Sequence, residues 1–132
     1  MSIENIPNKI YIQDFRDLKV WQKAVLLSDK IYEIVKGFPD YEKYAMSSQI
    51  TRCTTSISAN IAEGNSQLYV KKEFSFANNA LGSAAETKHW LEMAYRRKYI
   101  DYSIYYKLVE DTDEVIKMII GYMKKLKNEI KN

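Results

Sequence analysis

The sequence predicts an all-α fold, an antiparallel up-down-up-down four-helix bundle. Apolar residues recur every three or four positions through four long segments, which is the spacing of one buried face of a helix. Only four glycines and two prolines occur in 132 residues, and 46% of the residues are apolar. Because the segments between the expected helices are short, consecutive helices must run in opposite directions.

Each expected helix has its own start and stop signals. Asp14 or Asp17 can cap the first helix. Pro39 disfavours helix at the residue before it, and Gly64 is expected to close the second helix. The four helices are expected at about residues 17–36, 42–65, 70–98 and 102–127.

The apolar stripes define the expected core. On the first helix the inward residues are expected to be Leu18, Trp21, Val25, Ser28, Ile31, Tyr32 and Val35. On the second helix one stripe is formed by Met46, Ile50, Cys53, Ile57 and Ile61. The most buried residues of the chain are expected to include Leu18, Trp21, Ile31, Ile50, Ile57, Leu81, Leu91, Leu108, Val115 and Ile119.

Small residues are concentrated in the third expected helix, at Ala77, Ala80, Gly82, Ser83, Ala84 and Ala85. Glycine inside a helix costs about 1 kcal/mol relative to alanine, so the presence of Gly82 needs a compensating gain. Close packing against a neighbouring helix of the bundle is the favoured explanation. A contact between subunits is the alternative.

Polar side chains border the apolar stripe of the second helix. Polar groups beside a core must find hydrogen-bond partners. We therefore expect an interface between copies of the chain here, which the 11 tyrosines also favour. A hydrogen-bond network inside the bundle is the competing explanation. The four expected interface residues are Gln49, Arg52, Ser56 and Asn60.

Length and composition predict one domain, a bundle over residues 15–132 preceded by an arm over residues 1–14. The single cysteine, Cys53, excludes an intrachain disulfide and favours a reducing compartment. We find no charged segment followed by an apolar one, so no signal peptide is expected. The apolar runs are far shorter than the roughly 20 residues that span a membrane. The sequence therefore predicts a cytoplasmic protein without membrane association.

No catalytic site, metal or cofactor is expected. Glu86 and His89 have the spacing of a carboxylate-bridged metal site, but such a site needs a second pair of this type. His89 is the only histidine, so the second pair cannot exist. Cys53 lies in the apolar stripe, where a buried thiol is inert. The sequence therefore predicts a protein that is not an enzyme.

Basic side chains are expected to gather at one end of the bundle. Residues 70–100 carry six basic and three acidic side chains. In an antiparallel bundle the starts of the first and third helices lie beside the finish of the fourth. The residues expected to contact nucleic acid at this end are Arg16, Lys19, Lys23, Lys71, Lys72, Lys124, Lys125 and Lys127.

A smaller basic cluster is expected at the opposite end. It consists of Arg96, Arg97 and Lys98, followed by Tyr99, Tyr102, Tyr105 and Tyr106. Interleaved cations and aromatic rings can hold phosphates and stack on bases. A simpler explanation stays open for both clusters, because basic residues in a last turn complement the helix dipole. The tyrosines after position 100 also match the core spacing of the fourth helix.

Several sequence blocks, in the same order, resemble one known family. They are FRDLKVWQKA (residues 15–24), Phe38-Pro39, QITRCTTSISANIAEG (49–64), KKEF (71–74) and GSAAE (82–86). Over residues 15–125 the chain resembles small bacterial four-helix-bundle proteins encoded in intervening sequences of large-subunit ribosomal RNA genes. The chain departs from them at Thr51, where members often carry a second basic residue.

Relatives of that family serve as accessory proteins of diversity-generating retroelements. The resemblance therefore implies a homo-oligomer, with a ring of five favoured, that binds RNA or DNA and has a reverse transcriptase as a candidate partner. Two classes of function stay open at this point. One is a nucleic-acid-binding accessory factor whose subunits pool modest basic patches. The other is a scaffold that binds only protein.

Overall fold

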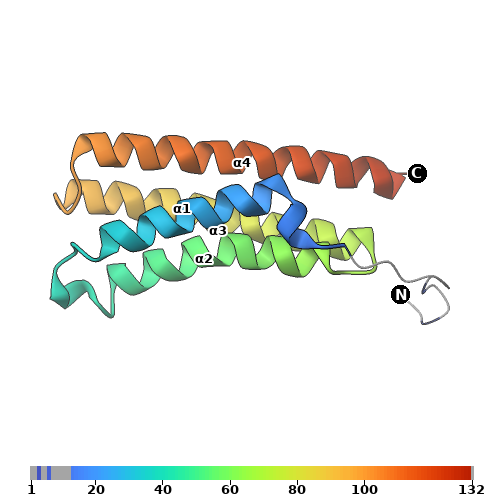
Figure 1. Ribbon diagram of the computed structural model, residues 1–132, viewed down its shortest axis with the longest axis horizontal. Helices are drawn as coiled ribbons and strands as arrows, with labels where there is room; N and C mark the ends of the chain where they lie inside the picture. Colours follow the sequence, from blue (N-terminus) through green and yellow to red (C-terminus); the bar gives the residue numbers. More distant parts are fainter. Residues whose placement is uncertain (1–2, 4–5, 7–12, 132) are drawn as a thin grey trace.

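The computed structural model describes residues 3, 6 and 13–131. This part of the chain contains no strand and has four α-helices, α1 (Lys19–Val35), α2 (Met46–Asn65), α3 (Val70–Arg96) and α4 (Tyr102–Lys131). Two short 3-10 helices precede α1 and α2, namely η2 (Phe15–Asp17) and η3 (Asp40–Glu42). Consecutive α-helices run in opposite directions (Figure 1), so the predicted antiparallel four-helix bundle is confirmed.

Each helix packs against two neighbours around one core. The contact between α2 and α3 is the most extensive, and the contact between α1 and α4 is the smallest. The starts of α1 and α3 and the finish of α4 lie toward the end of the bundle where both termini are marked (Figure 1). Of the predicted arm, residues 1–14, most lies outside the described residues.

Local hydrogen bonds explain where the first two helices begin. Asp14 accepts a hydrogen bond from the backbone N–H of Arg16, but this bond caps η2 and not α1. Leu18 is extended, and α1 begins after it. The second helix starts at Met46 and not near residue 42, because η3 occupies the chain just before it. The predicted boundaries are therefore wrong by a few residues at these starts.

The third helix ends two residues earlier than expected. Lys98 has a left-handed backbone with φ of 63°, which no helix can continue through. The Lys98 N–H donates to the carbonyl of Tyr95, and the Tyr99 N–H donates to the carbonyl of Ala94. These bonds satisfy the last carbonyls of α3, and the chain then turns into α4.

The expected stripe of α2 is confirmed, since Met46, Ile50, Cys53, Ile57 and Ile61 are all buried. The other residues correctly expected to be buried are Ile31, Leu91, Leu108, Val115 and Ile119.

Three residues expected in the core, Leu18, Trp21 and Leu81, are only half-buried. On α1 the face that is buried is rotated slightly from the predicted face. Its fully buried apolar side chains are Val20, Ala24, Leu27 and Ile31. This face leaves Tyr32 exposed, so the expectation that Tyr32 points inward is wrong.

Two glycines differ from expectation. The predicted end of α2 at residue 65 is confirmed, but Gly64 lies within the last turn and has no positive φ, so its use is not that of a left-handed helix stop. A Cβ on Gly64 would lie 2.7 Å from the Cβ of Phe76 and 3.2 Å from the carbonyl oxygen of Glu73, so the glycine lets α3 approach α2. At Gly82, in contrast, a Cβ would meet nothing within 4 Å. Packing within the bundle therefore does not explain Gly82, although it does explain the buried alanines of α3, which are Ala77, Ala80 and Ala84.

Candidate nucleic-acid interface

Six lysines lie at or near the start of α1, the start of α3 and the finish of α4, three helix ends that lie toward the same end of the bundle (Figure 1). All six side chains are exposed, and none forms an ion pair with a carboxylate in the described part of the chain. We call this surface the lysine end: Lys19, Lys71, Lys72, Lys124, Lys125 and Lys127. Ammonium groups that no carboxylate neutralises retain their full attraction for phosphate.

The other two residues predicted to contact nucleic acid have acidic partners. Arg16 donates two hydrogen bonds to the Asp14 carboxylate, at 3.0 Å from Nε and 2.8 Å from Nη2. These bonds lower the pKa of the Asp14 carboxyl, which stays ionised. The Nζ of Lys23 lies 3.3 Å from Oε1 of Glu114. Six of the eight predicted residues are thus exposed cations without an ion-pair partner among the described residues.

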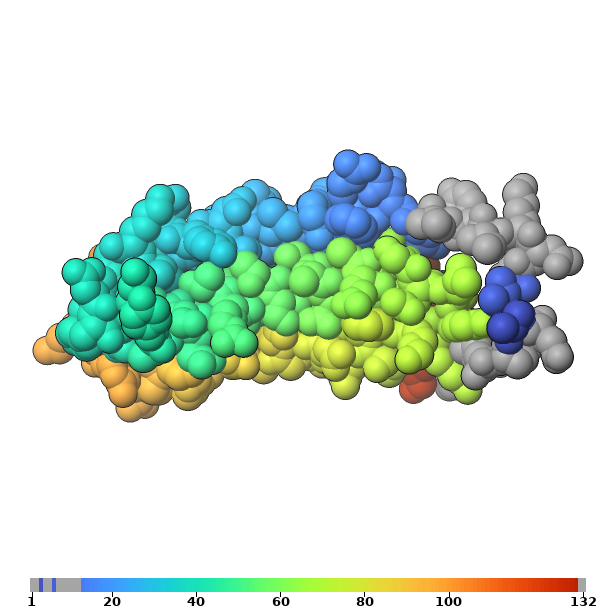
Figure 2. Space-filling view, turned by 90° about the horizontal axis from the view of Figure 1, so that it is seen from below, coloured from blue at the N-terminus to red at the C-terminus, as the bar shows by residue number. Residues whose placement is uncertain are grey.

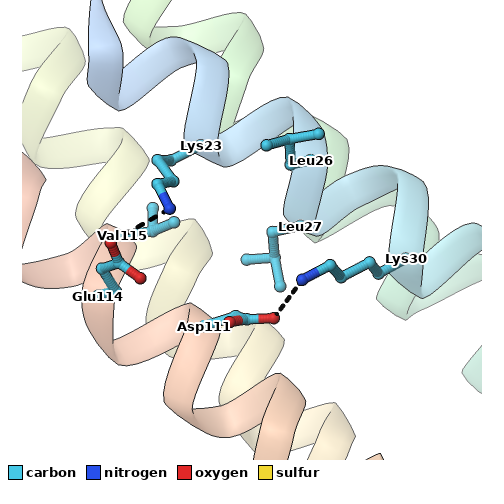
Figure 3. A pocket seen from close by; sticks show the side chains of 7 residues that line it. All are labelled: Lys23, Leu26, Leu27, Lys30, Asp111, Glu114 and Val115. Carbon is cyan, nitrogen blue, oxygen red and sulfur yellow. Dashed lines mark hydrogen bonds and ion pairs between the residues drawn. The ribbon is translucent and has the colours of Figure 1, made fainter.

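Lys23 belongs to a seam of ion pairs between α1 and α4 (Figure 3). In this seam the Nζ of Lys30 lies 2.8 Å from Oδ2 of Asp111. Burial opposes ionisation of Asp111, but Lys30 and Lys107 outweigh it and lower the pKa of the carboxyl. A cleft of about 40 Å³ in the seam is lined by Lys23, Leu26, Leu27, Lys30, Asp111, Glu114 and Val115. Acidic side chains in the first half of α4 therefore hold α1, whereas Lys117, Lys124, Lys125 and Lys127 of the second half form no ion pair within the described part of the chain.

A hydrogen-bond network that sequence patterns did not predict fixes the lysine end. The Nδ2 of Asn65 is 2.8 Å from Oε1 of Gln13, 3.2 Å from Oε2 of Glu73 and 3.3 Å from the hydroxyl of Tyr122. The Tyr122 hydroxyl also donates to Glu73. Burial and the bond to Glu73 raise the pKa of Tyr122, which therefore stays protonated. The network joins α2, α3 and α4, and it occupies the Glu73 carboxylate beside Lys71 and Lys72.

The four predicted interface residues divide into two pairs. Asn60 donates from Nδ2 to the Ser56 carbonyl at 2.8 Å and to Oγ of Ser56 at 2.9 Å. The hydroxyls of Ser56 and Ser83 are 3.0 Å apart, which joins α2 to α3. Bonds inside the bundle thus account for Ser56 and Asn60, as the competing explanation predicts.

Gln49 and Arg52 are exposed, and Arg52 makes no ion pair in the described part of the chain. Helices α2 (green) and α3 (yellow) lie side by side on the face in view in Figure 2, and Gln49 and Arg52 of α2 share a depression with Ser83 and Glu86 of α3. A shallow depression of about 370 Å³ there is lined by Gln49, Arg52, Cys53, Ser56, Ser83 and Glu86. These two side chains remain available to a partner.

The residues considered for metal binding or nucleophilic catalysis have structural contacts. Glu86 accepts a hydrogen bond from the indole N–H of Trp90 at 3.1 Å, and the His89 ring meets the Trp90 ring edge-on at 4.7 Å. Within the described residues no group of three acidic, histidine or cysteine side chains converges on a point that could hold a metal ion. Burial raises the pKa of the Cys53 thiol, which lies 3.4 Å from the Thr87 hydroxyl.

Among residues 3, 6 and 13–131, no helix is both long enough and apolar enough to cross a bilayer.

A family model described as 23S rRNA-intervening sequence protein matches residues 16–121. The chain is also similar to a solved structure from Bacteroides thetaiotaomicron VPI-5482, a protein of unknown function from the S23 ribosomal protein family. The two share 33% identity and a TM-score of 0.74 over 80% of this chain and 98% of that chain. No curated protein matches the sequence.

Proposed function

Because the chain belongs to the family of 23S rRNA-intervening sequence proteins, we propose that it is a non-enzymatic protein that binds RNA or DNA through its lysine end. The observation that carries the proposal is the set of six exposed lysines without carboxylate partners among the described residues. They come from α1, α3 and α4, and the Asn65–Glu73–Tyr122 network joins two of these helices, α3 and α4, to α2.

Binding of this kind depends on phosphate contacts. Each lysine that neutralises a phosphate releases a condensed counterion, so affinity falls steeply with salt. The lysine end offers ammonium groups and no set of side chains arranged to read base edges, so binding should tolerate many sequences. The family description names 23S rRNA, which makes structured ribosomal RNA the first ligand to test.

The test compares two variants that lose the same number of charges. In the first, Lys71, Lys72, Lys124 and Lys125 are changed to Gln. In the control, the ion-paired lysines Lys30, Lys36, Lys88 and Lys107 are changed to Gln. For duplex DNA, the first variant should flatten the slope of log affinity against log salt by about 0.9 per lost contact. The control should keep a slope close to that of the wild type.

Absence of any gel retardation of structured RNA or duplex DNA by the wild type, even at low salt, would refute the proposal. The remaining candidate would then be a scaffold that binds only protein. If both variants flattened the slope by the same amount, net charge would account for the binding and the position of the lysines would not matter.

We further propose that the protein is a homo-oligomer, with a ring of five favoured, in which several lysine ends form one surface. A ring needs two different faces on each subunit. The exposed Gln49 and Arg52 and the uncovered Gly82 supply candidate contacts on α2 and α3. Such a surface could hold RNA for a reverse transcriptase. Native mass spectrometry tests the ring, and a species of only 15.5 kDa at micromolar concentration would exclude it.

A further inference from the structure

A ladder of tyrosine rings covers the end of the bundle opposite the lysine end. Tyr95 stacks on Tyr105, with ring centroids 4.7 Å apart and planes at 21°. Tyr102 lies 5.8 Å from Tyr95 and 6.1 Å from Tyr106. The two outer rings are open to solvent, since Tyr102 is 59% exposed and Tyr106 is 57% exposed. The core spacing therefore holds for Tyr105, which packs against the core, but not for Tyr102 and Tyr106, whose rings are mostly exposed to solvent.

Two more tyrosines extend from the connection between α1 and α2, which lies at the same end as the connection between α3 and α4 (Figure 1). Tyr41 is 77% exposed and Tyr44 is 88% exposed. The hydroxyls of Tyr41 and Tyr99 are 2.9 Å apart, and Tyr99 donates to Glu42 at 2.8 Å. These bonds tie the Tyr41 loop to the end of α3, so the exposed rings stand on a fixed base.

Three carboxylates at this end accept hydrogen bonds, whereas the exposed Asp40 has none on its side chain among the described residues. Glu92 accepts from the Tyr105 hydroxyl at 2.7 Å and from Nε of Arg96 at 3.0 Å. Glu42 accepts from Tyr99, as described above, and Asp101 accepts from the backbone N–H of Ile104 at 2.9 Å.

Arg97 and Lys98, in contrast, are exposed and form no ion pair with any described carboxylate. Two cations thus remain beside the exposed rings.

Lys98 is also the one described non-glycine residue with positive φ, at 63°. This position follows the last turn of α3, where glycine is the residue that fits without strain. A non-glycine residue at a position whose backbone conformation favours glycine is a candidate for function. Helix-dipole stabilisation does not require a lysine at the strained position, because Arg96 and Arg97 already lie in and next to the last turn.

We propose that this surface, the tyrosine end, binds unpaired nucleotides of single-stranded RNA or DNA. It comprises Tyr41, Tyr44, Tyr102, Tyr106, Arg97 and Lys98. Bases stack on the outer rings of the ladder while Arg97 and Lys98 contact the phosphates. Bases inside a duplex are already stacked on each other, so the tyrosine end discriminates between single strands and duplexes. The proposal goes beyond the lysine end, which attracts phosphate in either form, and does not depend on it.

The test measures fluorescence anisotropy with a labelled single-stranded oligopyrimidine of about 12 nucleotides and with a duplex of the same length. The double variant Tyr102→Ala/Tyr106→Ala should weaken single-strand binding by roughly 5- to 150-fold per stacked base. Its affinity for the duplex should equal that of the wild type. The matched control Tyr102→Phe/Tyr106→Phe keeps both ring faces and should bind the single strand as the wild type does.

Two further variants guard against an effect on folding. Lys98→Gly should relieve the backbone at this position while weakening single-strand binding, which a merely structural role would not produce. Tyr44→Ala removes a ring that is 88% exposed and has the Lys43 Nζ 5.5 Å from its centroid, and should also weaken single-strand binding. Circular dichroism confirms the fold of each variant.

Several outcomes would overturn the proposal. Unchanged single-strand affinity in the alanine pair would do so, and so would equal weakening in the phenylalanine pair. Self-association of the wild type that the alanine pair abolishes, without any single-strand binding, would assign the surface to a protein contact. If the lysine end does not bind nucleic acid, the result is different. The wild type then does not bind the duplex, while the alanine and phenylalanine pairs still differ in their affinity for the single strand.

Discussion

The same substitution, glycine to alanine, should have opposite effects at two positions of this bundle. At Gly82 the added Cβ meets no atom within 4 Å, and the residue lies inside α3. Only the helix preference then matters, so Gly82→Ala should stabilise the protein by about 1 kcal/mol. At Gly64 the added Cβ would lie 2.7 Å from the Cβ of Phe76 and 3.2 Å from the carbonyl oxygen of Glu73.

The magnitude at Gly64 follows from these two contacts. Neither contacted atom is the end of a flexible side chain, so the backbone of α3 itself must move away. Overpacking of this kind costs about 1 to 3 kcal/mol, and a contact through the backbone belongs at the upper limit. The gain in helix preference returns at most about 1 kcal/mol. The net effect of Gly64→Ala should therefore be a loss of about 2 kcal/mol.

Urea unfolding followed by far-UV circular dichroism measures both changes. The slope of free energy against urea should be the same in all three proteins, and only the midpoints should move in opposite directions. A Gly64→Ala variant as stable as the wild type would mean that α2 and α3 are not in the close contact described here. Loss of stability in Gly82→Ala, dependent on protein concentration, would indicate that Gly82 lies in a contact between subunits.

Three other predictions follow from buried groups. Ile57 is fully buried, so Ile57→Ala should cost about 2 to 5 kcal/mol in the free energy of unfolding, and a smaller loss would indicate a loosely packed core. Thr54 has a buried hydroxyl without a hydrogen-bond partner among the described residues, so Thr54→Val should stabilise by about 1 kcal/mol. Thr112→Val should give no such gain, because its hydroxyl donates to the Leu108 carbonyl at 2.7 Å; equal effects of the two valines would contradict this reasoning. Tyr122 has a pKa raised above the ordinary 10.0, so an unfolded chain loses this proton first and stability should fall as pH rises above 10. Tyr122→Phe should remove part of that fall, and an unchanged pH profile would count against the network.

The part of the fold that sequence predicts best is the part that local periodicity determines. The α2 stripe from Met46 to Ile61 is buried as expected, because its apolar spacing allows only one inward face. On α1 the apolar residues are spread more widely around the helix. Which face of α1 is buried depends on how α2 and α4 pack against it. The prediction therefore places Trp21 and Tyr32 deeper in the core than they lie.

Contacts between residues far apart in the chain leave no local signal. Glu73 follows Lys71 and Lys72 in the sequence, and nothing local indicates that Asn65 of α2 and Tyr122 of α4 donate hydrogen bonds to its carboxylate. Gly64 looked like a helix stop, and the need for it becomes visible only when Phe76 of α3 is placed against it. Helix order and direction are enough to predict which helix ends share one end of the bundle, but not that Lys23 pairs with Glu114 of α4.

The distribution of carboxylates matters more to function here than the net charge of +3. Asp111, Asp113 and Glu114 of α4 form ion pairs with lysines of α1 and α3 along the middle of the bundle. These pairs neutralise carboxylates of α4 along the middle of the bundle. They include none of the six lysines of the lysine end, which have no carboxylate partner among the described residues. Exposed carboxylates also lie near these helix ends, at Asp17, Glu63 and Glu129. The proposed attraction for phosphate therefore depends on the local field of the six lysines together and not on the net charge. Under our two proposals the lysine end binds phosphates of any nucleic acid and the tyrosine end binds unpaired bases, so that one protein would contact both a structured region and an adjoining single strand.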